Sequence, residues 1–92
     1  MRRKYRSHVG ILLDILRAID SEGRATISRI ILIANIPYER LKPYLEKLLK
    51  EGYIREVFES EKKLYEVTEK GYKLMHELQM IKRVFDRLGF PL

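Results

Sequence analysis

The segment from residue 38 to residue 50 carries polar and cationic side chains on what would be the outer side of a helix. Arginine and lysine donate hydrogen bonds to phosphate oxygens and guanine edges, tyrosine can stack or contact the backbone, and glutamate can accept from cytosine N4. Arg40 and Lys47 lie seven residues apart, about two helical turns, so both can face one ligand. The segment predicts a nucleic-acid contact surface that contains Tyr38, Glu39, Arg40, Lys42 and Lys47.

An enzyme or a metal site would need other residue types or closer spacing. The chain has no cysteine, and its two histidines, His8 and His76, are far apart in sequence and have no neighbouring ligand pattern. No serine sits in a nucleophile elbow, and the dispersed glycines form no phosphate loop. The sequence therefore favours a binding protein without enzymatic activity, and we expect no metal and no cofactor.

The charge balance favours a polyanionic partner. The 92 residues include 19 Lys and Arg against 13 Asp and Glu, a net charge of +6. Nucleic acid is the first candidate, and an anionic membrane surface is the second. Charged residues interrupt every apolar run before it reaches the length of a membrane span, so we expect a cytoplasmic protein with no membrane partner. The abundance of Glu, Lys, Arg, Ile and Leu is typical of proteins from thermophilic organisms.

Apolar periodicity predicts four helices, over residues 7–20, 27–36, 37–51 and 69–88. The first helix has an apolar stripe of roughly 220°, which implies burial against two surfaces. Its open side is expected to hold only Gly10, Asp14 and Arg17. Pro43 falls inside the third helix, where it either bends the helix or makes its regular part begin later.

A β-hairpin is predicted between the third and fourth helices. Two runs rich in β-branched and aromatic residues, 53–58 and 63–68, flank a charged turn of residues 59–62. At the hairpin tip the charges of Glu59 and Glu61 nearly cancel those of Lys62 and Lys63. If the hairpin touches a phosphate backbone, it does so through Lys62 and Lys63. Residues 24–25 can add a short edge strand to it.

The last helix carries an apolar heptad seam, which predicts a partner helix and hence a homodimer. The seam residues recur at steps of four, three, four and three: Leu74, Leu78, Ile81, Phe85 and Leu88. We expect one chain to provide too little surface to bury Leu78, Ile81 and Phe85. Gly71, which follows the second strand directly, is expected to allow close packing.

These elements define an α+β, mostly α, fold class: a winged helix-turn-helix with a long C-terminal dimerisation helix. We divide the chain into a basic N-terminal arm (residues 1–6), a winged-helix head (residues 7–68) and a C-terminal coiled-coil helix (residues 69–92). Further candidate contacts for nucleic acid are Arg29 on the outer side of the second helix and, in the arm, Arg2, Arg3 and Lys4.

Two motifs occur in order along the chain. Leu-x-x-Tyr-Leu begins at Leu41 in the third helix, and Tyr-x-Val-Thr-x-Lys-Gly runs from Tyr65 to Gly71. Together with Asn35-Ile-Pro-Tyr38 and Gly52-Tyr-Ile54, they resemble the archaeal dimeric winged-helix DNA-binding proteins. That group includes ArnR-like regulators and small chromatin-associated proteins with a C-terminal coiled coil. The resemblance covers roughly residues 5–88.

The resemblance implies a homodimer whose C-terminal helices pair antiparallel and whose two heads bind duplex DNA. Carried over by position, the binding residues are Tyr38, Glu39, Arg40, Lys42, Pro43 and Lys47 in the third helix and Lys62 and Lys63 in the hairpin. The chain departs from the pattern in having a proline inside the recognition helix and an acidic hairpin tip.

Two functions remain open at this stage. The first is a homodimeric double-stranded-DNA-binding protein, a transcription regulator or chromatin-associated protein, with its third helix in the major groove. The second is a winged-helix protein-protein interaction module without DNA binding. In that case the third helix has a solvated face with ordinary pairs such as Lys42 with Glu46.

Overall fold

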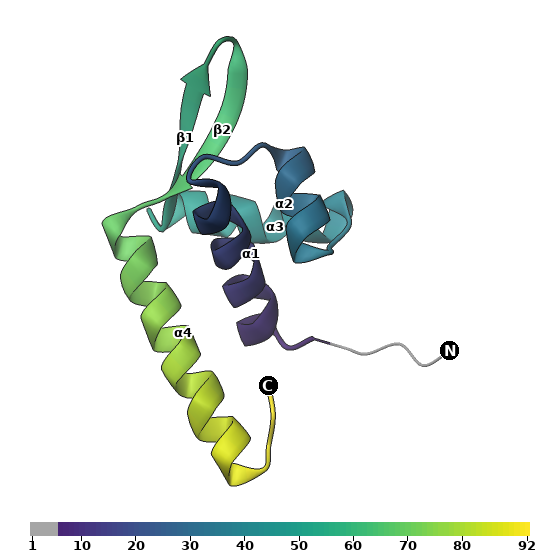
Figure 1. Ribbon diagram of the computed structural model, residues 1–92, viewed down its shortest axis with the longest axis vertical. Helices are drawn as coiled ribbons and strands as arrows, with labels where there is room; N and C mark the ends of the chain where they lie inside the picture. Colours follow the sequence, from purple (N-terminus) through teal and green to yellow (C-terminus); the bar gives the residue numbers. More distant parts are fainter. Residues whose placement is uncertain (1–5) are drawn as a thin grey trace.

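A computed structural model describes residues 6–92 (Figure 1). Over these residues the chain forms four helices and one two-stranded antiparallel sheet, which confirms the predicted α+β, mostly α, composition and the long C-terminal helix. The elements are α1 (His8–Glu22), α2 (Ile27–Ala34), α3 (Tyr38–Lys50), β1 (Ile54–Glu59), β2 (Lys62–Val67) and α4 (Glu69–Leu88). None of the helices in residues 6–92 is long and apolar enough to cross a membrane.

Three helices begin at a hydroxyl side chain. Ser7, Thr26 and Thr68 each accept a hydrogen bond from the backbone N–H three residues further on. Such a cap satisfies a donor that has no partner inside the helix, and each contributes about 1 kcal/mol. α2 ends earlier than predicted because Asn35 adopts the left-handed conformation, with φ 54°.

α3 begins at Tyr38, so Pro43 lies inside the helix. The helix therefore does not start after the proline, which was one of the two expectations. Proline has no N–H, so the carbonyl of Glu39 loses its partner within the helix. Both residues are exposed, which lets water take the place of the missing donor.

α1 is the centre of the core. It packs against α2, α4 and β2, as its wide apolar stripe predicts. Its buried side chains meet those of the other elements in one cluster, which includes Ile15, Leu16 and Ile19 from α1 with Ile30, Leu41 and Ile54. The prediction that Gly10 lies on the open side is wrong, because Ser7 and Arg6 cover it; a Cβ at Gly10 would lie 3.4 Å from Ser7 Oγ.

Each strand lies one residue closer to the turn than predicted, because Glu59 and Lys62 belong to the strands and pair with each other. The turn therefore has only two residues, Ser60 and Glu61, with φ values of 49° and 64°. Two positive φ angles give the kind of turn whose twist matches that of paired strands. Ala25 joins β2 through two backbone hydrogen bonds with Tyr65, of 2.9 and 2.8 Å, so the predicted edge strand is reduced to a single bridging residue.

α4 leaves the hairpin beside α1 and then extends past it (Figure 1). Its first turn is tightly packed: a Cβ at Gly71 would lie 2.0 Å from the carbonyl oxygen of Tyr53 and 2.7 Å from Val67 Cγ1. This confirms that Gly71 permits close packing. Thr68 also holds the start of α4 against the segment that follows α3, since its hydroxyl donates to the Gly52 carbonyl oxygen at 2.6 Å.

Candidate nucleic-acid interface

α2 and α3 are joined by a short, well-anchored turn. Ile36 is buried within it, and the carbonyl oxygen of Pro37 accepts from the N–H groups of Arg40 and Leu41, both at 3.0 Å. On the inner side of α3, Leu41, Leu45 and Leu48 enter the core. This burial turns the opposite side of α3 outward. The residues predicted for this side are all exposed: Tyr38, Glu39, Arg40, Lys42, Pro43 and Lys47.

The exposed side of α3 has two flanks with different surroundings. Arg40, Pro43 and Lys47 border a groove of about 710 Å³, which we call the α3–α4 groove. Its remaining walls come from α1, from the segment that follows α3 and from α4; its apolar lining consists of Leu12, Pro43, Tyr44, Leu48, Tyr53 and Leu74. Lys42 does not line the groove, so the predicted contact residues do not all share one surface.

A polar contact links α1 to α3 at one end of the groove. His8 Nδ1 lies 2.8 Å from the hydroxyl oxygen of Tyr44, and the two ring centroids are 6.0 Å apart. Glu39 and Glu51 also line the groove, so its rim combines acidic and basic groups around an apolar floor. The sequence did not predict this groove, because its walls come from segments that are far apart in the chain.

Two arginines in or beside the hairpin, which is the wing of this fold, are paired with carboxylates. Arg24 pairs with Glu66, Nε to Oε1 3.0 Å, and with Glu59. Arg55 also pairs with Glu66. Hydrogen bonds from Arg24 and then Arg55 lower the pKa of the Glu66 carboxyl, because they stabilise its ionised form.

Of the two predicted contact residues in the wing, one is also paired. Lys63 Nζ lies 3.5 Å from Glu56 Oε2, whereas Lys62 lies at the end of the hairpin beside the turn. Both lysines are exposed. The wing therefore offers less uncompensated positive charge than α3.

Arg29 is exposed on α2, and its Nε lies 3.1 Å from Glu22 Oε1, at the end of α1. Arg6, which we assigned to the arm, has a structural role: its guanidinium donates to Asp14 Oδ2 at 2.7 Å and to the carbonyl oxygens of Ala34 and Asn35 at 2.7 and 2.8 Å. No local sequence signal predicts a contact over so many residues. Arg2, Arg3 and Lys4 lie outside the described residues.

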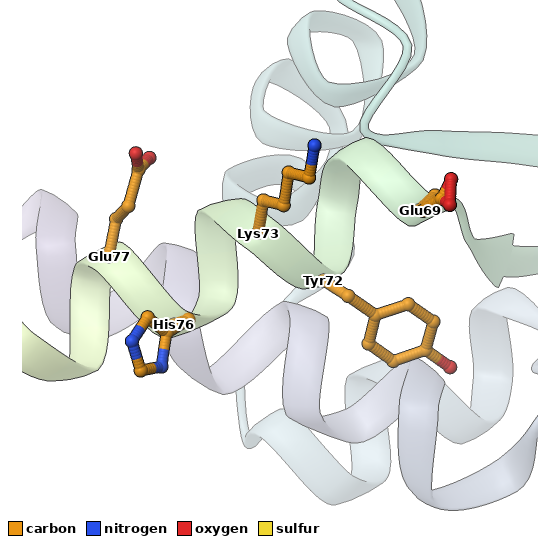
Figure 2. Close-up of a pocket in the computed structure, with 5 residues that line it drawn as sticks. All are labelled: Glu69, Tyr72, Lys73, His76 and Glu77. Atoms are coloured by element: carbon orange, nitrogen blue, oxygen red, sulfur yellow. The ribbon is translucent and has the colours of Figure 1, made fainter.

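The first turns of α4 carry a shallow depression of about 430 Å³ on one face (Figure 2). All of its lining residues belong to α4: Glu69, Tyr72, Lys73, His76 and Glu77. Tyr72 donates from its hydroxyl to Asp20 Oδ1 at 2.7 Å, a hydrogen bond that raises the pKa of the tyrosine. Within residues 6–92, no three His, Cys, Asp or Glu side chains are grouped to hold a metal ion. Through Tyr72, this face of α4 contacts the end of α1.

The heptad seam of α4 divides between two environments. Leu74 is half-buried, and Leu78, together with Met75, is buried within the single chain. The prediction that one chain cannot bury Leu78 is therefore wrong, because α1 packs against the first half of α4. Further along the helix the exposed apolar residues are Met80, Ile81, Val84, Phe85 and Leu88. Met80 and Val84 lie outside the predicted seam.

This arrangement of three helices, a two-stranded wing and a trailing helix is a winged helix-turn-helix. A family model described as winged helix-turn-helix matches residues 5–86, and the chain belongs to that family.

Relatives with higher identity come from archaea. The chain is similar to Sso10a-2, a DNA-binding protein from Sulfolobus solfataricus, with 34% identity, a TM-score of 0.82, and coverage of 90% of this chain and 85% of that one. It is also 32% identical over 77 residues to an uncharacterised protein of Methanocaldococcus jannaschii, which covers 84% of this chain and 74% of the relative.

Two bacterial structures share the fold at lower identity. A MarR-family transcriptional regulator from Silicibacter pomeroyi has a TM-score of 0.69 and 16% identity, over 83% of this chain and 56% of that one. BpsR from Bordetella bronchiseptica, whose DNA binding is regulated by 6-hydroxynicotinic acid, has a TM-score of 0.73 and 14% identity. The match covers 98% of this chain and 69% of that one.

Proposed function

We propose that this chain is a homodimeric double-stranded-DNA-binding protein that acts as a transcription regulator or chromatin-associated protein. The observation that carries the proposal is the exposed outer side of α3, with cations on both flanks, in a chain similar to a DNA-binding protein. The net charge of +6 supports the same partner. This role is not enzymatic, and it belongs in the cytoplasm of an archaeal cell.

The spacing of charges on α3 suits the major groove. That groove is about 12 Å wide, close to the diameter of a helix with its side chains, so phosphates lie on both sides of an inserted helix. We propose that Arg40 and Lys47 contact one row of phosphates and Lys42 the other. Tyr38 and Glu39, in the first turn, are then placed to reach base edges or the backbone.

Other parts of the chain would add contacts around α3. Arg2, Arg3 and Lys4 precede α1 and can bind the adjacent backbone electrostatically. In the wing, Lys62 is the better candidate, since Lys63 already has a carboxylate neighbour. Arg29 would have to exchange Glu22 for a phosphate.

We further propose that the second half of α4 forms the dimer interface. Ile81 is 42% exposed and Leu88 62% exposed in the single chain, and both lie on the predicted seam. A second copy of α4 would cover these side chains, and removing apolar surface from water favours association. Two heads joined in this way would bind a DNA site that contains two half-sites.

A protein-protein interaction module without DNA binding is the alternative. The observation that favours it is the pairing at the wing, where Arg24 and Arg55 are bound to glutamates. In that case the charged side of α3 is solvated, and an apolar surface makes the contact.

A titration of the protein against random duplex DNA at rising salt concentration separates these two functions. Phosphate contacts release counterions, so the slope of log affinity against log salt is about −0.9 per contact. The proposal predicts tight binding at low salt that weakens steeply as salt rises. Absence of binding at low salt contradicts DNA binding and favours the interaction module.

A further inference from the structure

Two apolar surfaces of this chain lie at opposite ends of α4. One is the α3–α4 groove, to which α4 contributes Leu74 from its first half. The other is the C-terminal end of the helix, where Leu88 is 62% exposed and Phe90 67% exposed. A monomer leaves both surfaces in water.

The end of α4 has a defined shape. Gly89 adopts φ 85°, and the N–H groups of Gly89 and Phe90 donate to the carbonyl oxygens of Asp86 and Phe85 at 3.1 and 2.9 Å. This pattern of hydrogen bonds is the Schellman motif, which closes a helix and holds the residue after the glycine in place. The backbone of Phe90 is thus held in place, while its large apolar side chain is mostly exposed.

An antiparallel pairing of two α4 helices would bring the two surfaces together. Leu74 and Leu88 each lie seven residues from Ile81. In an antiparallel pair of α4 helices centred on Ile81, Leu88 of one copy therefore lies beside Leu74 of the other. Since Leu74 lines the groove, the C-terminal end of the second copy would then reach the mouth of that groove.

We propose that the α3–α4 groove is the binding site for the C-terminal end of a second copy of this chain, with Leu88 and Phe90 as the residues that enter it. This inference rests on the dimer of the proposed function and goes beyond it. The apolar floor of the groove accepts the phenyl ring and the leucine side chain. Each copy then supplies one end and one groove, so the contact occurs twice.

The contact has a consequence for α3. Arg40 and Lys47 border the groove, so the second copy would pack against their aliphatic stems while their charged ends stay outside the groove, where they can contact phosphates. The dimer partner would in this way support the flank of the recognition helix. Loss of Phe90 should therefore weaken dimerisation by about tenfold or more, since a buried aromatic residue is a typical interface hot spot.

The absence of cysteine from the chain permits a clean cross-linking test. Two single variants, Lys47→Cys and Phe90→Cys, are mixed and treated with a short bismaleimide. Lys42→Cys replaces Lys47→Cys in the control, because it lies on the same helix outside the groove. The proposal predicts a covalent heterodimer for Lys47→Cys with Phe90→Cys and none for the control. Phe90→Cys alone should not cross-link to itself, because antiparallel pairing keeps the two ends apart.

Sedimentation of the same proteins separates this inference from the dimer on which it rests. A dimer that forms no cross-link between positions 47 and 90 overturns the groove contact alone. Self-cross-linking of Phe90→Cys indicates parallel pairing and also overturns it. A protein that stays monomeric at high concentration overturns both the dimer and the contact. A tenfold weaker dimer in Phe90→Ser, with an unchanged monomer fold, would be independent support.

Discussion

The two halves of α4 follow one heptad pattern and yet have different surroundings. In the first half, Met75 and Leu78 are buried against the rest of the same chain. In the second half, Ile81, Phe85 and Leu88 remain exposed, although their spacing continues the same seam. A heptad pattern therefore shows that a helix needs an apolar partner, but it does not show whether the same chain or another one supplies it.

The largest effect is expected at the base of the first half. Gly71→Leu would place a side chain where even a Cβ lies 2.0 Å from the Tyr53 carbonyl oxygen. We expect it to lower the free energy of unfolding by about 3 kcal/mol or more, although its helix propensity alone would stabilise α4 by up to about 1 kcal/mol. Chemical denaturation measures this change.

Gly10→Ala is the control for that substitution, because its nearest neighbour outside the helix backbone is 3.4 Å from the new Cβ. It should leave stability unchanged or raise it slightly. An unchanged melting temperature in Gly71→Leu would show that the first turn of α4 is not fixed to the head.

The next prediction compares the two halves directly. Leu78→Ala should lower the free energy of unfolding by about 2–4 kcal/mol even at low protein concentration, because it removes a side chain buried within one chain. Ile81→Asp combined with Phe85→Asp should instead give folded monomers, because the charges disrupt only the surface between copies. Circular dichroism and sedimentation measure the two outcomes. If the double variant unfolds the head, the second half serves the same core as the first.

Substitutions on α3 should have smaller effects, which appear in DNA binding and not in stability. Arg40→Ala, Lys47→Ala and Lys42→Ala should each reduce the salt slope by about 0.9, since each removes one phosphate contact. Lys73→Ala removes the same charge from α4 instead of α3 and is the control (Figure 2). Equal slopes for wild type and all α3 variants would exclude α3 from the interface.

The smallest expected effect is in the wing. Arg24 and Arg55 lower the pKa of Glu66 below its ordinary value of 4.5, so the ion pairs stabilise the fold fully above that pH. The stabilisation is lost as the pH falls through the lowered pKa. The difference in melting temperature between wild type and Glu66→Gln should therefore shrink below about pH 4.5. Glu61→Gln, at the hairpin turn, is the matched control.

Much of the fold can be predicted from local patterns. Thr26 and Thr68 are recognisable as helix caps, and the close packing at Gly71 follows from a glycine placed directly after a strand. These features depend on residues that are neighbours in sequence. The two-residue turn at Ser60 and Glu61 was harder to predict, because neither residue is the glycine or asparagine that positive φ angles favour.

The candidate site was predictable only in part, because its geometry depends on contacts across the chain. Periodicity correctly placed Arg40, Lys42 and Lys47 on the outer side of α3. It could not show that Leu12 and Leu74 meet one flank of that helix to form a groove. Periodicity also could not show that Arg6, unlike a freely solvated residue of a basic arm, donates a hydrogen bond to the end of α2.

The most direct test of a homodimer that binds duplex DNA is sedimentation equilibrium of the protein with a fluorescently labelled duplex at low salt. The account predicts a complex whose mass equals one duplex plus two chains, and it predicts that the complex dissociates as salt is raised. A duplex that sediments alone, or with a single chain at saturation, would contradict the account.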